Sequence, residues 1–205
     1  HGEILWAKTL GISGYDSARS VTTDIDGNIY VAGITNSSIS YSSGTAEKVG
    51  SYDPFIVKLD PLGEILWAGN FGASRHDECF SLELDSEGNL LLAGYFRGNW
   101  TIGEDTYTSQ GTNGHPDGFL LKIDTEGQVL WSIAGGKGST ELFYDIRLDA
   151  DDNIFVVGEQ DHTYDFGGTE VVGSGTTVAK VAPDGTVVWA KCLGDSGGGG
   201  RGIEF

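Results

Sequence analysis

Gly63-Glu64-Ile65-Leu66-Trp67 is one of four copies of a short phrase that recurs along this 205-residue chain. The other copies are Gly2-Glu3-Ile4-Leu5-Trp6, Gly127-Gln128-Val129-Leu130-Trp131 and Gly185-Thr186-Val187-Val188-Trp189. Successive tryptophans are 61, 64 and 58 residues apart. A repeat of this length is one supersecondary unit, which buries its apolar faces only against neighbouring units. The phrase therefore predicts a repeat architecture.

The segments between the phrases predict four strands in each copy. A strand of alternating character, residues 18–23 in the first copy, ends at an Asp-, Gly- and Asn-rich turn that suits a hairpin. The next run, residues 29–33, is apolar on both faces and predicts a strand inside stacked sheets. A long loop, a third strand at residues 55–59 and a second tight turn lead to the tryptophan strand. The prediction is an all-β fold of four-stranded antiparallel meanders, which are typical of β-propeller blades.

Three linked patterns carry a resemblance to a known family. They read W-A-x-x-x-G, then D-x-x-G-N-[IL]-x-[VL]-x-G, then D-x-F-[IL]-[VL]-K-[IL]-D-x-x-G, and they resemble the SBBP-type bacterial β-propeller repeat from Gly2 to about Gly194. The third copy departs from the pattern at Asp152, Gly175 and Ala182. The resemblance implies a secreted or surface-displayed bacterial protein, often beside adhesion modules, without a shared catalytic set.

The repeats also predict how the chain is divided. We expect a single β-propeller segment over residues 1–205, with full blades at about 12–71, 72–135 and 136–194 and partial blades at 1–11 and 195–205. The chain would begin with an outermost strand and open a further blade at Ile203-Glu204-Phe205. Because propellers use about four to eight blades, we expect a longer protein, with strand sharing between molecules as the alternative. Either arrangement would cover the open sheet edges.

Composition excludes several classes of partner. The formal net charge is −18, and a nucleic-acid partner is not expected because its phosphates would be repelled. The chain has no run of 18 apolar residues, so membrane insertion is not expected either. Cys79 and Cys192 fall at different places in the repeat, which excludes a repeated disulfide framework and leaves two buried thiols or a chance pair.

Calcium is the one cofactor that the turns suggest. Two hairpin turns present oxygen ligands at alternate positions, as calcium loops do, and the residues concerned are Asp24, Asp26, Asn28, Asp85, Glu87 and Asn89. A hard cation would suit the acidic surface. The twelve-residue loop with its terminal glutamate is missing, however, and Asp and Asn also form plain turns. Calcium binding and simple turn formation therefore both stay open.

The long loops are the predicted ligand surface. Antiparallel order places the short turns of every blade on one face and the long loops on the other, at residues 34–52, 95–116 and 159–175, with connections at 11–15, 72–76 and 135–140. These loops differ between copies while the scaffold does not, and binding sites usually lie on such loops. The candidate ligand-binding residues are Tyr15, His76, Trp100, Tyr107, His115, His162 and Tyr164. In the alternative, Trp100, Tyr107 and Tyr164 pack in small extra hairpins over the blades.

These observations favour a non-enzymatic scaffold for adhesion or binding, extracellular or on the bacterial cell surface, with a protein or glycan partner. One alternative is a structural subunit of an extracellular filament that self-assembles through its open sheet edges. Another is a glycan-active enzyme, which needs paired carboxylates. Asp16, Asp77 and Glu141 recur where the inner strands open and would be its acids. Their recurrence at one repeat position favours a scaffold role.

Overall fold

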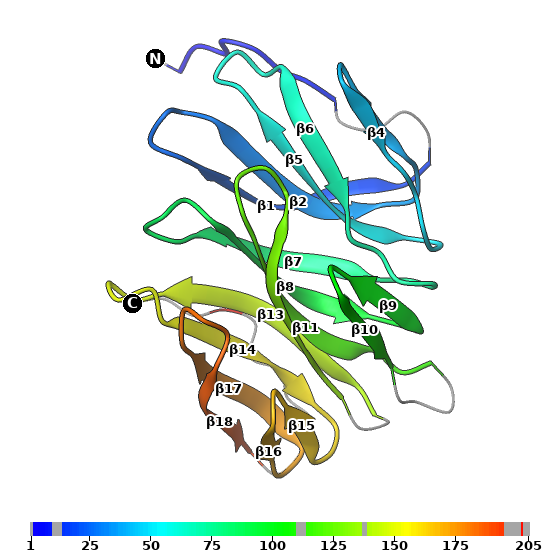
Figure 1. The fold of residues 1–205 in the computed structure, drawn as a ribbon, viewed down its shortest axis with the longest axis vertical. Coiled ribbons are helices and arrows are strands. Elements are labelled where there is room, and N and C mark those ends of the chain that lie inside the picture. The colour runs from blue at the N-terminus through cyan, green and yellow to red at the C-terminus, as the bar shows by residue number, and fades with distance from the viewer. Residues whose placement is uncertain (1, 10–13, 110–113, 137–138, 195–201, 203–205) are drawn as a thin grey trace.

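The chain folds into successive twisted antiparallel sheets that lie face to face (Figure 1). The structure, a computed structural model, describes residues 2–9, 14–109, 114–136, 139–194 and 202. All of the regular elements in these residues are strands, which confirms the predicted all-β class. The same residues contain no helix of the length and apolar character needed to cross a membrane.

Each repeat forms one blade of four strands in the predicted order. The first blade consists of β1 (Asp16–Thr23), β2 (Ile29–Thr35), β5 (Asp53–Leu59) and β6 (Ile65–Asn70). The second consists of β7 (Glu78–Leu84), β8 (Leu90–Phe96), β11 (Asp117–Ile123) and β12 (Val129–Gly135). The third consists of β13 (Glu141–Leu148), β14 (Ile154–Gln160), β17 (Gly175–Val181) and β18 (Val187–Leu193). Consecutive strands within each blade pair antiparallel, as tight turns allow.

The apolar core lies between the facing blades. Strand β8 is buried along its whole length. Leu90 and Leu92 belong to the apolar cluster shared with the first blade, whereas Leu91 and Ala93 belong to the cluster shared with the third. A strand with neighbours on both faces needs apolar residues at every position, so the predicted buried runs are confirmed.

A bulge recurs in the first strand of every blade. It falls at Arg19 in β1, Phe80 in β7 and Tyr144 in β13. The bulge brings a carbonyl oxygen of this strand against the glycine of the second strand, where an added Cβ would lie only 1.9 to 2.1 Å from that oxygen; the glycines are Gly33, Gly94 and Gly158. The glycine that ends the second-strand pattern is therefore required by a close backbone approach.

Short hairpins are inserted into the long loops. They are β3 (Ile39–Tyr41) with β4 (Gly44–Ala46), β9 (Asn99–Ile102) with β10 (Asp105–Thr108), and β15 (Tyr164–Phe166) with β16 (Thr169–Val171). The third joins the edge of β12 in the preceding blade through a bridge between Gly135 and Phe166. In the second, Trp100 donates its indole N–H to the carbonyl of Phe71, beyond β6, at 2.8 Å. Both of these hairpins therefore tie one blade to the one before it.

The tryptophan of the repeated phrase makes the same bond at successive junctions. Its indole N–H donates to a carbonyl in the second tight turn of the next blade: Trp6 to Pro61 at 3.2 Å, Trp67 to Thr125 at 2.8 Å and Trp131 to Pro183 at 3.1 Å. We call this contact the indole clasp. The first three phrases thus each contact the blade that follows them.

The ends of the chain differ in part from expectation. The predicted outermost strand around Trp6 is not formed, because residues 2–9 have no third strand of their own blade beside them in the described chain. The clasp of Trp6 holds this segment against the first blade nonetheless. The strand predicted at Ile203-Glu204-Phe205 lies outside the described residues, as do parts of the connections at 11–15 and 135–140.

Candidate functional site

A pocket of about 230 Å³ lies on the loop face between the first and second blades. We call it the first junction pocket, and it is lined by Tyr15, Ile34, Tyr52, His76 and Glu78. Strand β2 carries Ile34 and strand β7 carries Glu78, while the tyrosines and the histidine come from residues just before strands. Rigid strands therefore position side chains that the variable loops supply.

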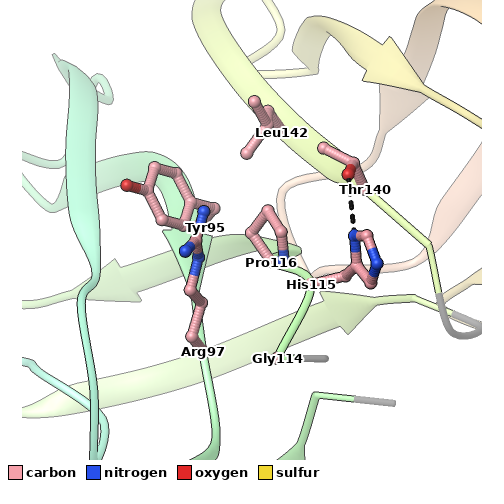
Figure 2. A pocket seen from close by; sticks show the side chains of 7 residues that line it. All are labelled: Tyr95, Arg97, Gly114, His115, Pro116, Thr140 and Leu142. Atoms are coloured by element: carbon pink, nitrogen blue, oxygen red, sulfur yellow. Dashed lines mark hydrogen bonds between the residues drawn. The ribbon is translucent and has the colours of Figure 1, made fainter. Parts of the chain in front are cut away.

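A second pocket, of about 350 Å³, lies between the second and third blades at the equivalent place. This second junction pocket is lined by Tyr95, Arg97, Gly114, His115, Pro116, Thr140 and Leu142, as Figure 2 shows. Four pairs occupy equivalent repeat positions in the two pockets: Ile34 and Tyr95, Tyr52 and Pro116, His76 and Thr140, Glu78 and Leu142. The scaffold thus repeats one concave site and changes its chemistry from junction to junction.

Aromatic rings connect the two pockets. The ring centroids of Tyr15 and Tyr52 are 5.9 Å apart, those of Tyr52 and His76 4.8 Å, and those of His76 and Tyr95 6.2 Å. These spacings are those of edge-on or offset ring pairs. Tyr15 keeps 51% of its surface exposed. The rings form a partly open aromatic wall that runs from one junction to the next.

Glu78 accepts hydrogen bonds from two of the residues that form or adjoin this aromatic wall. Its Oε1 accepts hydrogen bonds from His76 Nε2 at 3.0 Å and from the Tyr95 hydroxyl at 3.2 Å, and its Oε2 accepts one from Arg19 at 3.3 Å. Burial and the Glu78 charge both raise the pKa of Tyr95, so its hydroxyl stays protonated and continues to donate. One carboxylate therefore orients a ring from each pocket.

The second junction pocket carries one guanidinium group and one imidazole group. The Arg97 guanidinium lies over the Tyr95 ring, 5.5 Å from its centroid, in a cation–π contact. His115 Nδ1 is 3.3 Å from the Thr140 hydroxyl across the pocket (Figure 2). Pro116 and Leu142 supply apolar surface between them. A few polar groups converging on an apolar wall are typical of small-molecule sites.

The predicted ligand residues separate into three groups. Tyr15 and His76 line the first junction pocket and His115 lines the second. His162 is exposed beyond β14. Trp100 and Tyr164 are 0% exposed and half-buried Tyr107 packs on Trp100, so these three form the interiors of hairpins. These three residues therefore follow the alternative prediction, in which they pack in small extra hairpins over the blades.

Tyr52, Tyr95 and Arg97 line the pockets but were not among the residues predicted from the sequence. Tyr52 and Pro116 precede equivalent third strands, so variation at that position was the available signal. Tyr95 was not selected because it lies within β8, a strand that is buried along its whole length. Its side chain lines a pocket together with Thr140 and Leu142 of the next blade.

The recurrent acids Asp16, Asp77 and Glu141 accept hydrogen bonds from nearby loop residues. Asp77 is 0% exposed, and its two oxygens accept the amide N–H groups of Ala73 and Arg97 at 2.6 and 2.7 Å. Asp16 accepts from the Ser37 hydroxyl at 3.3 Å, and Glu141 from the Ser139 hydroxyl at 2.7 Å. These carboxylates hold loops in place, as turn-binding acids do. That the protein is not an enzyme stays a prediction.

The predicted calcium turns line a groove of about 340 Å³ on the opposite face. Asp24 Oδ1 accepts the amides of Asp26 and Asn28, and Asp85 Oδ1 accepts those of Glu87 and Asn89. Asp85 also pairs with Lys122 at 2.8 Å. Within the described ranges no group of three or more His, Cys, Asp or Glu side chains could hold a metal ion. Calcium binding at these turns stays a prediction.

Comparison with known proteins supports the repeat assignment. Residues 5–39 match the family model SBBP, described as a beta-propeller repeat, which confirms the resemblance. The "Uncharacterized WD repeat-containing protein L264" of Acanthamoeba polyphaga mimivirus is 24% identical over 156 residues, or 68% of this chain and 11% of that protein. The "Regulatory protein FlaEY" of Caulobacter vibrioides is 21% identical over 165 residues, or 78% of this chain and 17% of that protein. The family model and the mimivirus protein both carry the word repeat in their descriptions, which supports a repeat scaffold for this chain.

Proposed function

We propose that this protein is a non-enzymatic binding scaffold, extracellular or on a bacterial cell surface, that holds a protein or glycan ligand at the junction pockets of its loop face. The observation that carries the proposal is the recurrence of one concave site at two equivalent junctions with different linings. A scaffold that keeps its strands and varies its pockets is organised for recognition.

The chemistry of the first junction pocket supports binding. Tyr15, Tyr52 and His76 supply flat amphipathic surface at a small cost in side-chain entropy, as rings do at binding sites. Glu78 offers hydrogen-bond acceptance at the floor of the same pocket. In contrast, the acids that could have been catalytic hold their own loops. This contrast favours binding over catalysis.

The binding experiment compares two faces of one molecule. The purified chain would be screened on a glycan array and a peptide array, together with a loop-face variant, Tyr15→Ala with Tyr52→Ala. The matched control is Ile25→Ser with Leu62→Ser, because these side chains are 101% and 78% exposed on the turn face. The loop-face variant should lose binding at least about tenfold, as central aromatic contacts do, and the control should keep it.

Two results would count against the proposal. Equal binding by the loop-face variant, or loss only in the turn-face control, would move the site away from the junction pockets. The location is tested separately by protease treatment of intact producing cells. Digestion of the protein while a cytoplasmic marker survives supports an exposed location, and full protection contradicts it.

A further inference from the structure

The second junction pocket concentrates positive charge in a strongly acidic protein. The net charge of the chain is −18, yet the Arg97 guanidinium lines this pocket. The Arg75 guanidinium lies at its edge, because a Cβ added to Gly114 would be 2.6 Å from Arg75 Nη1. Two guanidinium groups thus meet at one junction, beside the imidazole of His115.

This charge is not neutralised nearby. Neither Arg75 nor Arg97 forms an ion pair with any acid among the residues that the structure describes. Arg97 Nε is buried and has no hydrogen-bond partner there. Asp77 lies within electrostatic range of Arg97, but both of its oxygens already accept backbone amides. A buried donor without a partner is costly, so a ligand that supplies an acceptor would be favoured.

The geometry of the cationic groups selects a planar anion. A guanidinium offers its donors in a flat fork that matches the two oxygens of a carboxylate. The Tyr95 ring beneath Arg97 keeps this fork from turning freely, since the two are in a cation–π contact. The rest of the lining, Pro116, Leu142 and the Thr140 hydroxyl, suits the body of a small ring with hydroxyl groups.

The neighbouring pocket indicates a polymer of such rings. His76 and Tyr95 connect the two pockets, with ring centroids 6.2 Å apart, and the Tyr95 hydroxyl bonds to Glu78 of the first junction pocket. Sites that recur at a fixed repeat position fit a ligand whose own units recur. A sugar chain presents such units, with flat C–H faces for the tyrosines and hydroxyls for Glu78.

We propose that the second junction pocket binds the carboxylate of an acidic sugar unit in a glycan chain, with Arg97 as its main contact and Arg75 at its flank, while the first junction pocket stacks an adjoining unit on its rings. This inference rests on the proposed binding function. It adds the ligand class and the residues that distinguish an acidic glycan from a neutral one.

Calorimetric titration with tetragalacturonate, a uronic-acid tetramer, tests the inference. Arg97→Gln should weaken binding by about 10- to 100-fold, which is the usual effect of losing a charged hydrogen-bond pair. Arg97→Lys should be intermediate because it keeps the charge and loses the fork. Arg75→Gln should weaken binding less. Lys48→Gln is the matched control, since Lys48 is an exposed lysine in another loop and its loss changes the net charge equally.

The methyl ester of the same tetramer isolates the carboxylate. It should bind the unaltered protein as weakly as the free acid binds Arg97→Gln, and its affinity should not change further in that variant. Circular dichroism melting of each variant establishes that the fold is retained. If Arg97→Gln does not fold, the ester and Arg75→Gln still decide the matter.

Three outcomes would overturn the inference. Equal affinity for the acid and its ester would show that the arginines do not bind the carboxylate. Equal or tighter binding of a tetraglutamate peptide would assign the pocket to acidic peptides. Lack of uronate binding, while another array ligand still depends on Tyr15 and Tyr52, would refute the acidic glycan and leave the proposed binding function standing.

Discussion

Asp77 holds two segments that meet at the junction pockets. One oxygen fixes Ala73 in the connection before β7, and the other fixes Arg97 in the loop after β8. Burial raises the pKa of Asp77 to about 7, although both amide bonds act to lower it. The residue that orients the cationic loop is therefore itself sensitive to pH.

We predict that Asp77 gives the protein a measurable pH dependence of stability. Between about pH 4 and 7 the folded chain holds a proton on Asp77 that the unfolded chain releases, so the free energy of unfolding falls as pH rises through this window. The contribution is at most about 1.4 kcal/mol per pH unit for one group. Urea unfolding at several pH values measures it.

Asp77→Asn is the comparison for this prediction. The amide cannot accept with both atoms, so the variant should lose about 1–3 kcal/mol of stability from one unpaired backbone N–H. It should also lose the slope that Asp77 contributes, while all other carboxyl groups remain. Identical slopes in both proteins would show that Asp77 ionises normally in the fold.

At the scale of elements, the indole clasps join strands that are far apart in sequence. Trp67 in β6 of the first blade bonds to the carbonyl of Thr125 in the second blade, 58 residues away. The same turn carbonyl accepts a longer bond from Lys58 at 3.4 Å. Since each clasp crosses a blade junction, its loss should loosen the contact between blades more than the sheet that carries it.

We predict that Trp67→Phe lowers the free energy of unfolding by about 1 kcal/mol, the net value of one hydrogen bond, because most of the ring packing is kept. Trp189→Phe is the control, because no acceptor for its indole N–H is recorded in the described part of the chain. Denaturant unfolding compares the two. Equal losses in both variants would mean that ring size rather than the clasp matters.

The elements were largely predictable because the repeat supplies the same signals several times. The Asp and Gly turns and the buried runs identified all four strands of each blade, as β8 illustrates. The strand expected around Trp6 failed because strand formation needs a partner, which a local pattern does not reveal. The hairpins were only an alternative, since they lie in loops whose sequences do not repeat.

At the scale of the whole molecule, the excess of negative charge opposes compaction. The formal charge is −18, and like charges repel one another across the folded surface. Screening weakens this repulsion, because the Debye length falls from about 30 Å at 0.01 M salt to about 8 Å at 0.15 M. Stability and solution conditions are therefore coupled in this protein.

We predict that the thermal midpoint rises when sodium chloride is increased over that range. A triple variant, Glu104→Gln, Glu126→Gln and Glu170→Gln, changes three exposed acids and reduces the formal charge from −18 to −15. It should show a higher midpoint at low salt and a smaller rise. A midpoint that falls with salt would indicate that ion pairs such as Lys122 with Asp85 dominate instead.

The candidate site was only partly predictable, because it depends on how whole blades lie beside one another. The variable loops supplied Tyr15, His76 and His115, which the fold brings to junction pockets; that these residues bind a ligand stays a prediction. Trp100 and Tyr164 looked equivalent in sequence, yet both are fully buried. Tyr95 and Arg97 join the site through the placement of one blade beside another. The spacing of residues along the chain does not predict that placement.

The indole clasp also bears on how such a chain can grow. In the three clasps, the phrase carries the donor for the junction ahead of it, and the second turn of the next blade carries the acceptor. A duplicated gene segment of one repeat length would therefore encode both the indole donor and the carbonyl acceptor of the clasp. Copy number could change in a lineage without new joints having to evolve, while each added copy would bring one more concave site free to acquire its own specificity.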